Sequence, residues 1–103
     1  MPRIGVIAKL TAADGRREDL VEAFQAMFPA VDKEEGTELY VLHKAIDDGD
    51  VVYFYELYAD EAALGAHATS DTMKEVGGAL RELLAGRPEI VRLEPVRAKG
   101  VTL

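Results

Sequence analysis

The most strand-like stretch of this sequence is VVYFYELY, residues 51–58. Its β-branched and aromatic residues occupy both alternating sets of positions, so both faces of the strand carry apolar side chains. An acidic turn, DDGD at residues 47–50, separates it from a second β-rich run over residues 37–45. Two such runs joined by a short turn are typical of a β-hairpin. The centre of the chain is therefore predicted to be an antiparallel hairpin.

Upstream of the hairpin, the sequence predicts a first strand over residues 3–11 and then one amphipathic helix. The helix follows Asp14, a candidate N-cap in a turn that contains glycine, and it ends at Gly36. Pro29 lies inside the helical pattern and lacks a backbone N–H, which predicts a kink or a loosened last turn near Phe28. The apolar positions at helical spacing are Leu20, Phe24, Met27, Phe28 and Val31.

Two further helices and a fourth strand are predicted after the hairpin. Asp60 can cap a short helix that carries His67 near its end, and Ser70 can cap a longer helix. Residues 86–88, which contain a glycine and a proline, are expected to end the longer helix, and residues 89–96 form the last strand. The apolar stripe of the longer helix consists of Met73, Val76, Gly77, Leu80, Leu83 and Leu84.

The order of these elements, β-α-β-β-α-β, is that of the split βαβ motif, and it predicts a ferredoxin-like α+β fold with a four-stranded antiparallel sheet. Residues 1–103 are expected to form a single domain with a core over about residues 4–96 and a short C-terminal extension over 97–103. Helices can cover only one sheet face, so the apolar second face needs another cover. A second copy of the same sheet would supply it, which predicts a homodimer. The alternative is a monomer whose tyrosine hydroxyls line a half-wet open sheet.

Composition excludes several classes of function. The 103 residues include no cysteine, which excludes disulfides, thiolate nucleophiles and sulfur metal sites. The net charge is −7 and no basic stripe is present, so we expect no nucleic-acid partner. No run approaches the ~20 apolar residues of a membrane helix, and the first apolar stretch is too short for a signal-peptide core. We therefore expect a cytoplasmic protein that binds no membrane.

The most informative stretch for assigning a family is ELYADEAALGAHATSDTM, residues 56–73. It resembles the signature of the antibiotic biosynthesis monooxygenase family. That signature has a strand ending in Glu and an aromatic residue, an acidic cap, an Ala-Leu helix closed by His, and a Ser-started helix with a bulky apolar residue three positions on. Residues 36–40, GTELY, resemble the family's Gly-Thr/Cys-x-x-Tyr entry to the second strand.

This resemblance covers about residues 4–96 and implies a dimeric α/β barrel. Family members of known activity oxidise phenolic or quinol-like rings, in several cases with neither flavin, haem nor metal. A deprotonated phenol can itself pass an electron to dioxygen, so the protein needs to supply only a dry cavity, orientation and a proton acceptor. The resemblance thus implies a small aromatic substrate and dioxygen as reactants.

His67 is the candidate catalytic proton acceptor. Its reference pKa near 6.5 allows proton exchange around neutral pH, and the family pattern has His at this point. The alternative is a structural role, in which a His at a helix end caps backbone carbonyls or packs beside Leu64.

Glu56 is the second catalytic candidate, because it shares a strand face with Phe54 and Tyr58. A lone carboxylate among aromatic side chains would have its pKa raised by burial. The alternative is a hydrogen bond or ion pair that fixes the end of the strand, at the dimer interface.

Five aromatic residues are candidates for binding the substrate ring, since phenol-lined apolar cavities suit flat aromatic ligands. They are Tyr40, Tyr53, Phe54, Tyr55 and Tyr58. The two histidines and the scattered carboxylates show no metal-ligand spacing, so we expect neither a metal nor a cofactor. His43, on a predicted strand without a matching motif, is interpreted as structural or surface.

Two other chemistries are disfavoured. The haem-degrading branch of the superfamily uses an Asn on the first strand, a Trp, and a His on the third helix; this chain has Ala8, no Trp and Gly77 instead. Gly77-Gly78 also lacks the flanking glycines and lysine of a phosphate loop, so we interpret it as a position of close helix packing.

Three hypotheses for function remain open at this point. The first is a cofactor-independent monooxygenase that oxidises a quinol or polyphenol. The second is a non-catalytic dimer that binds a small aromatic ligand, and the third is an isomerase-like or decarboxylase-like member of the dimeric α/β barrel group. A fold alone does not choose among them.

Overall fold

The computed structural model describes residues 2–103 of the chain. This part contains four strands and four helices joined by turns and loops. No helix in this part combines the length and apolarity that crossing a membrane requires. In chain order the elements are β1 (Ile4–Thr11), α1 (Arg17–Phe24), α2 (Met27–Val31), β2 (Thr37–Lys44), β3 (Val51–Tyr58), α3 (Glu61–Ala68), α4 (Asp71–Leu80) and β4 (Glu89–Leu93).

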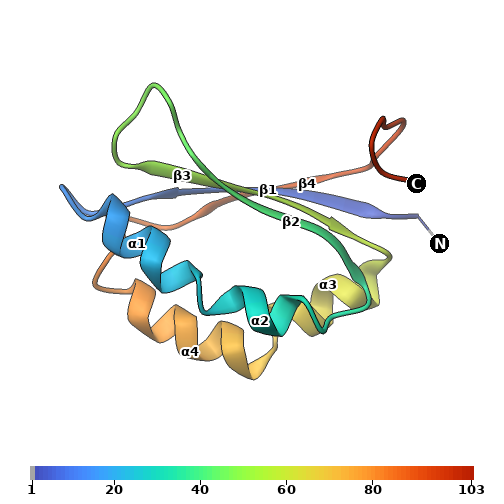
Figure 1. Ribbon diagram of the computed structural model, residues 1–103, viewed down its shortest axis with the longest axis horizontal. Coiled ribbons are helices and arrows are strands. Elements are labelled where there is room, and N and C mark those ends of the chain that lie inside the picture. The colour runs from blue at the N-terminus through green and yellow to red at the C-terminus, as the bar shows by residue number, and fades with distance from the viewer. Residues whose placement is uncertain (1) are drawn as a thin grey trace.

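The sheet has the strand order β2-β3-β1-β4, with all neighbours antiparallel, and every helix lies on the same side of it (Figure 1). This arrangement confirms the predicted ferredoxin-like α+β fold. β3 lies inside the sheet between β2 and β1, which explains why its sequence is apolar or aromatic at every position except Glu56. Its residues Val52, Phe54 and Glu56 point to the helices, and the residues between them point to the opposite face.

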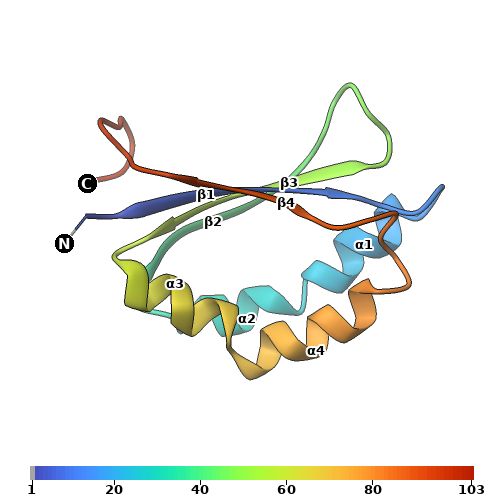
Figure 2. The same ribbon diagram turned by 180° about the vertical axis from the view of Figure 1, so that it is seen from behind.

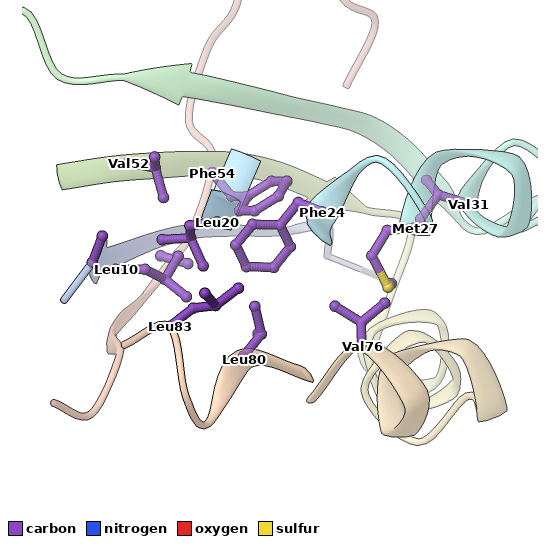
Figure 3. Packing of buried hydrophobic residues seen from close by; sticks show 12 residues of the cluster. Leu10, Leu20, Phe24, Met27, Val31, Val52, Phe54, Val76, Leu80 and Leu83 are labelled. Carbon is purple, nitrogen blue, oxygen red and sulfur yellow. The ribbon is translucent and has the colours of Figure 1, made fainter. Parts of the chain in front are cut away.

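The hydrophobic core lies between the sheet and the helices (Figure 3). Phe24 of α1 contacts Phe54 of β3 edge to face, with ring centroids 4.7 Å apart. Leu20 and Met27 are completely buried, and Leu80 of α4 belongs to the same cluster. Burying a side chain of this size stabilises a fold by roughly 1.5–3 kcal/mol. The predicted apolar stripes of the helices therefore do face the sheet.

The start of the first helix differs from the prediction. α1 begins at Arg17, and the side chain of Arg16 at its N-cap makes no capping hydrogen bond but pairs with Asp19. Asp14 is not the N-cap but lies in the preceding turn, next to Gly15 with a φ of 74°. That turn needs a residue that tolerates positive φ, and it uses up the positions that a helix starting at Asp14 would have occupied.

The helix before the hairpin is interrupted at residues 25–26, two to three residues before Phe28 and thus close to the predicted kink. Residues 25–26 form a turn between α1 and α2, and the Phe28 N–H bonds to the Gln25 carbonyl at 3.3 Å. Gln25 is four residues before Pro29, and the ring of a proline crowds the carbonyl at that position. The proline therefore breaks the helix at the carbonyl it displaces rather than at its own position.

The longer helix also ends earlier than predicted. α4 stops at Leu80, six residues before the expected stop at Gly86. Leu84, predicted to lie on the helix, instead forms an isolated β-bridge with Ala12, the residue after β1. Backbone pairing with Ala12 and with the last residue of β1, Thr11, thus replaces further helical hydrogen bonds here.

The last strand is shorter than the predicted 89–96. β4 runs over Glu89–Leu93, and Leu93 pairs with Gly5 close to the start of β1, so few partners are left for further residues. Pro95 then lacks the N–H that a ladder needs.

The interpretation of Gly77-Gly78 as close helix packing is wrong. A Cβ atom placed on either glycine meets nothing within 4 Å. Both positions therefore have room for a side chain.

The second face of the sheet has no helix over it within residues 2–103 (Figures 1 and 2). The β2–β3 loop and the C-terminal segment rise on this side of the sheet. Val91 and Leu93 of β4 are 50% and 38% exposed, and Ile46 in the loop is 99% exposed. We call this surface the open face. Its cover by a second copy of the chain stays a prediction.

Candidate functional site

A cavity of about 380 Å³ lies between the sheet and helices α3 and α4. Its volume falls in the range of small-molecule sites, and its lining is almost entirely apolar. The central strand β1 contributes Val6 and Ala8 to the wall, and the small Ala8 side chain leaves space that a larger residue would fill. Leu64 of α3 with Met73 and Leu80 of α4 lie on the helix side.

The polar groups of the cavity are arranged in a row across the sheet. Strand pairing places Arg92 of β4 opposite Val6 of β1, Val6 opposite Glu56 of β3, and Glu56 opposite Tyr40 of β2. All four residues line the cavity. The row therefore has a cation at one sheet edge, a carboxyl group at the centre and a phenol at the other edge strand.

His67 lies in the last turn of α3 and is 3% exposed, which is more buried than a helix-end residue is expected to be. Its Nδ1 is 2.9 Å from Oε1 of Glu34, in the loop between α2 and β2. The hydroxyl of Thr37 donates to the same Oε1 at 2.8 Å, which fixes the carboxylate in place. A carboxylate only accepts hydrogen bonds, so the proton of the neutral imidazole is held on Nδ1.

The other ring nitrogen, Nε2 of His67, is buried and has no hydrogen-bond partner within residues 2–103. With the proton held on Nδ1, Nε2 carries a free lone pair. The His67 side chain is also part of the cavity wall. A buried, unsatisfied acceptor is costly in a folded protein, which makes Nε2 a candidate acceptor for a hydrogen bond from a ligand.

Local backbone features bring Glu34 and His67 together. Gly36 lies so close to α3 that a Cβ atom at this position would be 2.4 Å from the Cβ of Ala63. The carbonyl of Gly36 also accepts a hydrogen bond from the N–H of Ala59 at 2.8 Å, just before the helix starts. The lack of a side chain at Gly36 therefore lets α3 rest on the loop that carries Glu34.

An extra residue in β2 contributes to the same site. Thr37 pairs with Tyr58 and Leu39 pairs with Leu57, which leaves Glu38 as a β-bulge. Because side chains alternate between the two faces of a strand, Thr37 and Tyr40 would point to opposite faces without the bulge. With it, both point to the helix side.

Glu56 is a buried carboxyl group, 7% exposed, that accepts a hydrogen bond of 2.5 Å from the hydroxyl of Tyr58. Burial raises the pKa of Glu56, against smaller opposing effects of the Tyr58 hydrogen bond and of His67. The side chain faces the helices and not the open face, so it does not lie at the predicted dimer interface.

The two tyrosines near His67 remain neutral phenols. Burial, reinforced by the carboxyl groups of Glu56 and Glu34, raises the pKa of Tyr40. Burial and the hydrogen bond to Glu56 raise the pKa of Tyr58. Neither phenol can therefore act as a proton acceptor near neutral pH, which leaves His67 and Glu56 as the candidate proton acceptors.

Aromatic rings surround the imidazole. The ring centroids of Tyr40 and Tyr58 lie 5.2 Å and 5.5 Å from that of His67. Tyr40 is in turn 4.7 Å from Phe54, which lines the cavity. The structure thus brings together five of the predicted site residues, His67, Glu56, Tyr40, Phe54 and Tyr58.

Tyr53 and Tyr55 are not brought to this cavity. They alternate with Phe54 along β3 and pair with Lys9 and Ile7 of β1, so they lie on the open face. The aromatic run alone did not reveal which face carries the site. His43, predicted to be structural or surface, is exposed.

The sequence prediction missed Glu34 and Arg92. Glu34 is one of several acids in its loop, and only its spacing of three residues from Thr37 distinguishes it. Arg92 could have been found by continuing the face alternation of the last strand from Ile90. Within residues 2–103, no three His, Asp or Glu side chains are grouped so that they could hold a metal ion.

Solved structures of other proteins share this architecture. Among curated proteins, none matches the sequence. PA3566 from Pseudomonas aeruginosa is 27% identical and has a TM-score of 0.86, with 94% of this chain and 97% of that chain covered. A Caulobacter crescentus protein, provisionally assigned as an antibiotic biosynthesis monooxygenase, is 29% identical with a TM-score of 0.87, covering 93% of this chain and 92% of its own.

Rv0793 from Mycobacterium tuberculosis is 25% identical, with a TM-score of 0.85 and coverage of 93% of this chain and 97% of that chain. The sequence profile described as "Antibiotic biosynthesis monooxygenase" matches residues 3–78, which is most of the chain and includes Glu34, Tyr40, Glu56 and His67. The chain belongs to the antibiotic biosynthesis monooxygenase family.

Proposed function

We propose that this protein is a monooxygenase that needs no cofactor and oxidises a small quinol or polyphenol with dioxygen. The observation that carries the proposal is the free Nε2 of His67, on a buried imidazole that Glu34 orients at the wall of an apolar cavity. Membership of the family supports the reaction class.

In the proposed reaction, a phenolic hydroxyl of the substrate donates its proton to Nε2 of His67. Glu34 stabilises the imidazolium that forms, as a carboxylate does in a His–Asp pair. The phenolate then passes an electron to dioxygen in a cavity that excludes bulk water. For a simple phenol, one oxygen atom ends on the ring as a quinone carbonyl and the other leaves as water, and the ring supplies all the electrons.

The neighbouring residues have supporting roles in this proposal. Tyr40 and Phe54 pack against the substrate ring. Glu56, whose pKa is raised, is a second group that can hold or return a proton. Tyr58 acts indirectly, because its hydroxyl is engaged by Glu56.

We further propose that the working form is a homodimer in which two open faces pack together. This arrangement would cover the exposed apolar residues of β4 and place Tyr53 and Tyr55 in the interface.

The test is oxygen uptake by purified, metal-free protein across a panel of quinols. Uptake above the autoxidation rate, lost in His67→Gln and kept in a Tyr53→Phe control, is the expected result. Quinol binding without uptake would instead favour the ligand-binding alternative, and substrate conversion without oxygen consumption would favour the isomerase-like one.

A further inference from the structure

The cavity opens at the edge of the sheet. β4 is an edge strand, and its residues Pro88, Ile90 and Arg92 line the cavity. Ile90 is 58% exposed although it forms part of the wall. A ligand therefore enters between β4 and the helices, and it passes Arg92.

Arg92 is held at this entrance by an ion pair. Its guanidinium nitrogen is 2.5 Å from Oε2 of Glu61, in the first turn of α3. The two side chains are 55% and 67% exposed. Ion pairs at such exposed positions contribute little to stability, so an incoming anion can replace Glu61 at low cost.

The charges along the row leave one place for a ligand anion. Arg92 is the only Lys or Arg among the cavity-lining residues in the described part of the chain. At the inner end, Glu34 binds His67 and none of the described cavity-lining residues there is a Lys or Arg, so a negative group would meet the Glu34 carboxylate with no cation to balance it. Arg92 and Glu56 are separated by one strand, which corresponds to about 10 Å between their backbones.

We propose that the substrate is a phenol that carries a carboxylate, with the phenolic end at His67 and the carboxylate bound to Arg92 in exchange for Glu61. The phenolic end of this inference rests on the proposed function, whereas the acidic end rests on the cavity entrance alone. Arginine suits the second task because its planar fork pairs with both oxygens of a carboxylate.

The test compares two ligands of equal shape and different charge, 3-(3,4-dihydroxyphenyl)propanoate and its primary amide. Binding is measured by calorimetry without oxygen, so that no turnover occurs. The expected result is that the native protein binds the acid at least roughly tenfold more tightly than the amide. High salt should reduce this preference.

Four variants test whether Arg92 itself, and not the net charge of the protein, causes the preference for the acid. Arg92→Gln should bring the acid-to-amide ratio close to one, and Arg92→Lys should keep part of it. Glu61→Gln should raise the ratio, because it removes the competing carboxylate. Arg3→Gln is the matched control, since Arg3 makes a similar pair with Glu38 away from this cavity and the change in net charge is the same.

Equal affinity for acid and amide in the native protein, or an unchanged ratio in folded Arg92→Gln, would overturn the inference. So would failure of both ligands to bind. If uncharged quinols still cause oxygen uptake in any of these cases, the proposed function remains supported although the inference about Arg92 fails. If the protein clearly prefers the acid but no quinol causes oxygen uptake, the inference about Arg92 remains supported and the proposed function fails. Glu61→Gln keeps the test decisive even if Arg92→Gln does not fold.

Discussion

Nδ1 of His67 and Oε1 of Glu34 are 2.9 Å apart, although the residues are 33 positions apart in the chain. This contact joins the last turn of α3 to the loop before β2, and it sets which ring nitrogen carries the proton. Any change at Glu34 should therefore act on chemistry through His67, without Glu34 itself touching the substrate.

The first prediction concerns this pair. His67→Gln should lower turnover by ~10²–10⁴-fold, the range for loss of a positioned general base. Glu34→Gln should lower kcat by roughly tenfold or more with little change in KM, because it weakens stabilisation of the imidazolium and leaves the cavity walls intact. Oxygen uptake per folded molecule measures both effects. A Glu34→Gln protein with normal kcat would remove Glu34 from the mechanism.

A substitution at His67 should lower the stability of the fold more than a substitution at a half-exposed helix end would. His67→Ala removes a buried ring and leaves Glu34 with only the Thr37 hydroxyl as a hydrogen-bond donor, so we expect a loss of about 1–3 kcal/mol in the free energy of unfolding. Denaturant titration checks this. For that reason, His67→Gln is the better variant for activity.

The second prediction concerns the approach of α3 to its supporting loop. Gly36→Ala should destabilise the fold by about 1–3 kcal/mol, because the new Cβ overlaps with the Cβ of Ala63 and the helix must move. Ala63→Gly alone should cost about 1 kcal/mol as a glycine in a helix. The double variant should nevertheless be more stable than Gly36→Ala, and thermal melts of the three proteins test this order. A double variant weaker than both single variants would contradict the packing argument.

The third prediction is a pH dependence that comes from Glu56. Its pKa is raised in the folded protein, so its contribution to stability is fully present below the unfolded pKa of about 4.3 and is lost as pH rises through the folded value. Glu56→Gln keeps an oxygen for the Tyr58 hydroxyl and carries no charge. The variant should therefore gain stability relative to the native protein as pH increases from about 4 to 8. If the denaturant midpoints of the native protein and of Glu56→Gln stay parallel over this range, the pKa of Glu56 is not raised in the folded protein.

The fourth prediction concerns the open face. Light scattering at micromolar concentration should give about twice the chain mass of 11.2 kDa. Tyr55→Asp places a charge in the middle of this face and should yield monomers, whereas Asp47→Asn in the exposed loop should not. A native mass that stays near 11.2 kDa across dilutions, with the fold retained, would contradict the dimer.

Local sequence signals predicted most of the fold but only part of the site. Strong periodicity and the turn at residues 47–50 were sufficient for the order of the elements. The end of α4 was misplaced because its competitor, pairing of Leu84 with Ala12, joins distant parts of the chain and leaves no local signal. Glu34 was missed for the same reason, since its importance arises only when α3 folds back onto its loop.

The aromatic residues show the same limit on a smaller scale. Alternation along β3 correctly grouped Glu56 with Phe54 and Tyr58, but it did not tell which group would face the helices. That choice depends on which face the helices cover, which is a property of the whole domain.

The bulge at Glu38 makes the site sensitive to chain length as well as to side-chain identity. If β2 were a regular strand with all of its residues paired, either Thr37 or Tyr40 would turn away from the imidazole. Deleting Glu38 would instead leave Thr37 and Tyr40 two positions apart, so that a regular strand could keep both on the helix side. A designer who transplants the site onto an idealised sheet would therefore have to carry the bulge along or remove this one residue.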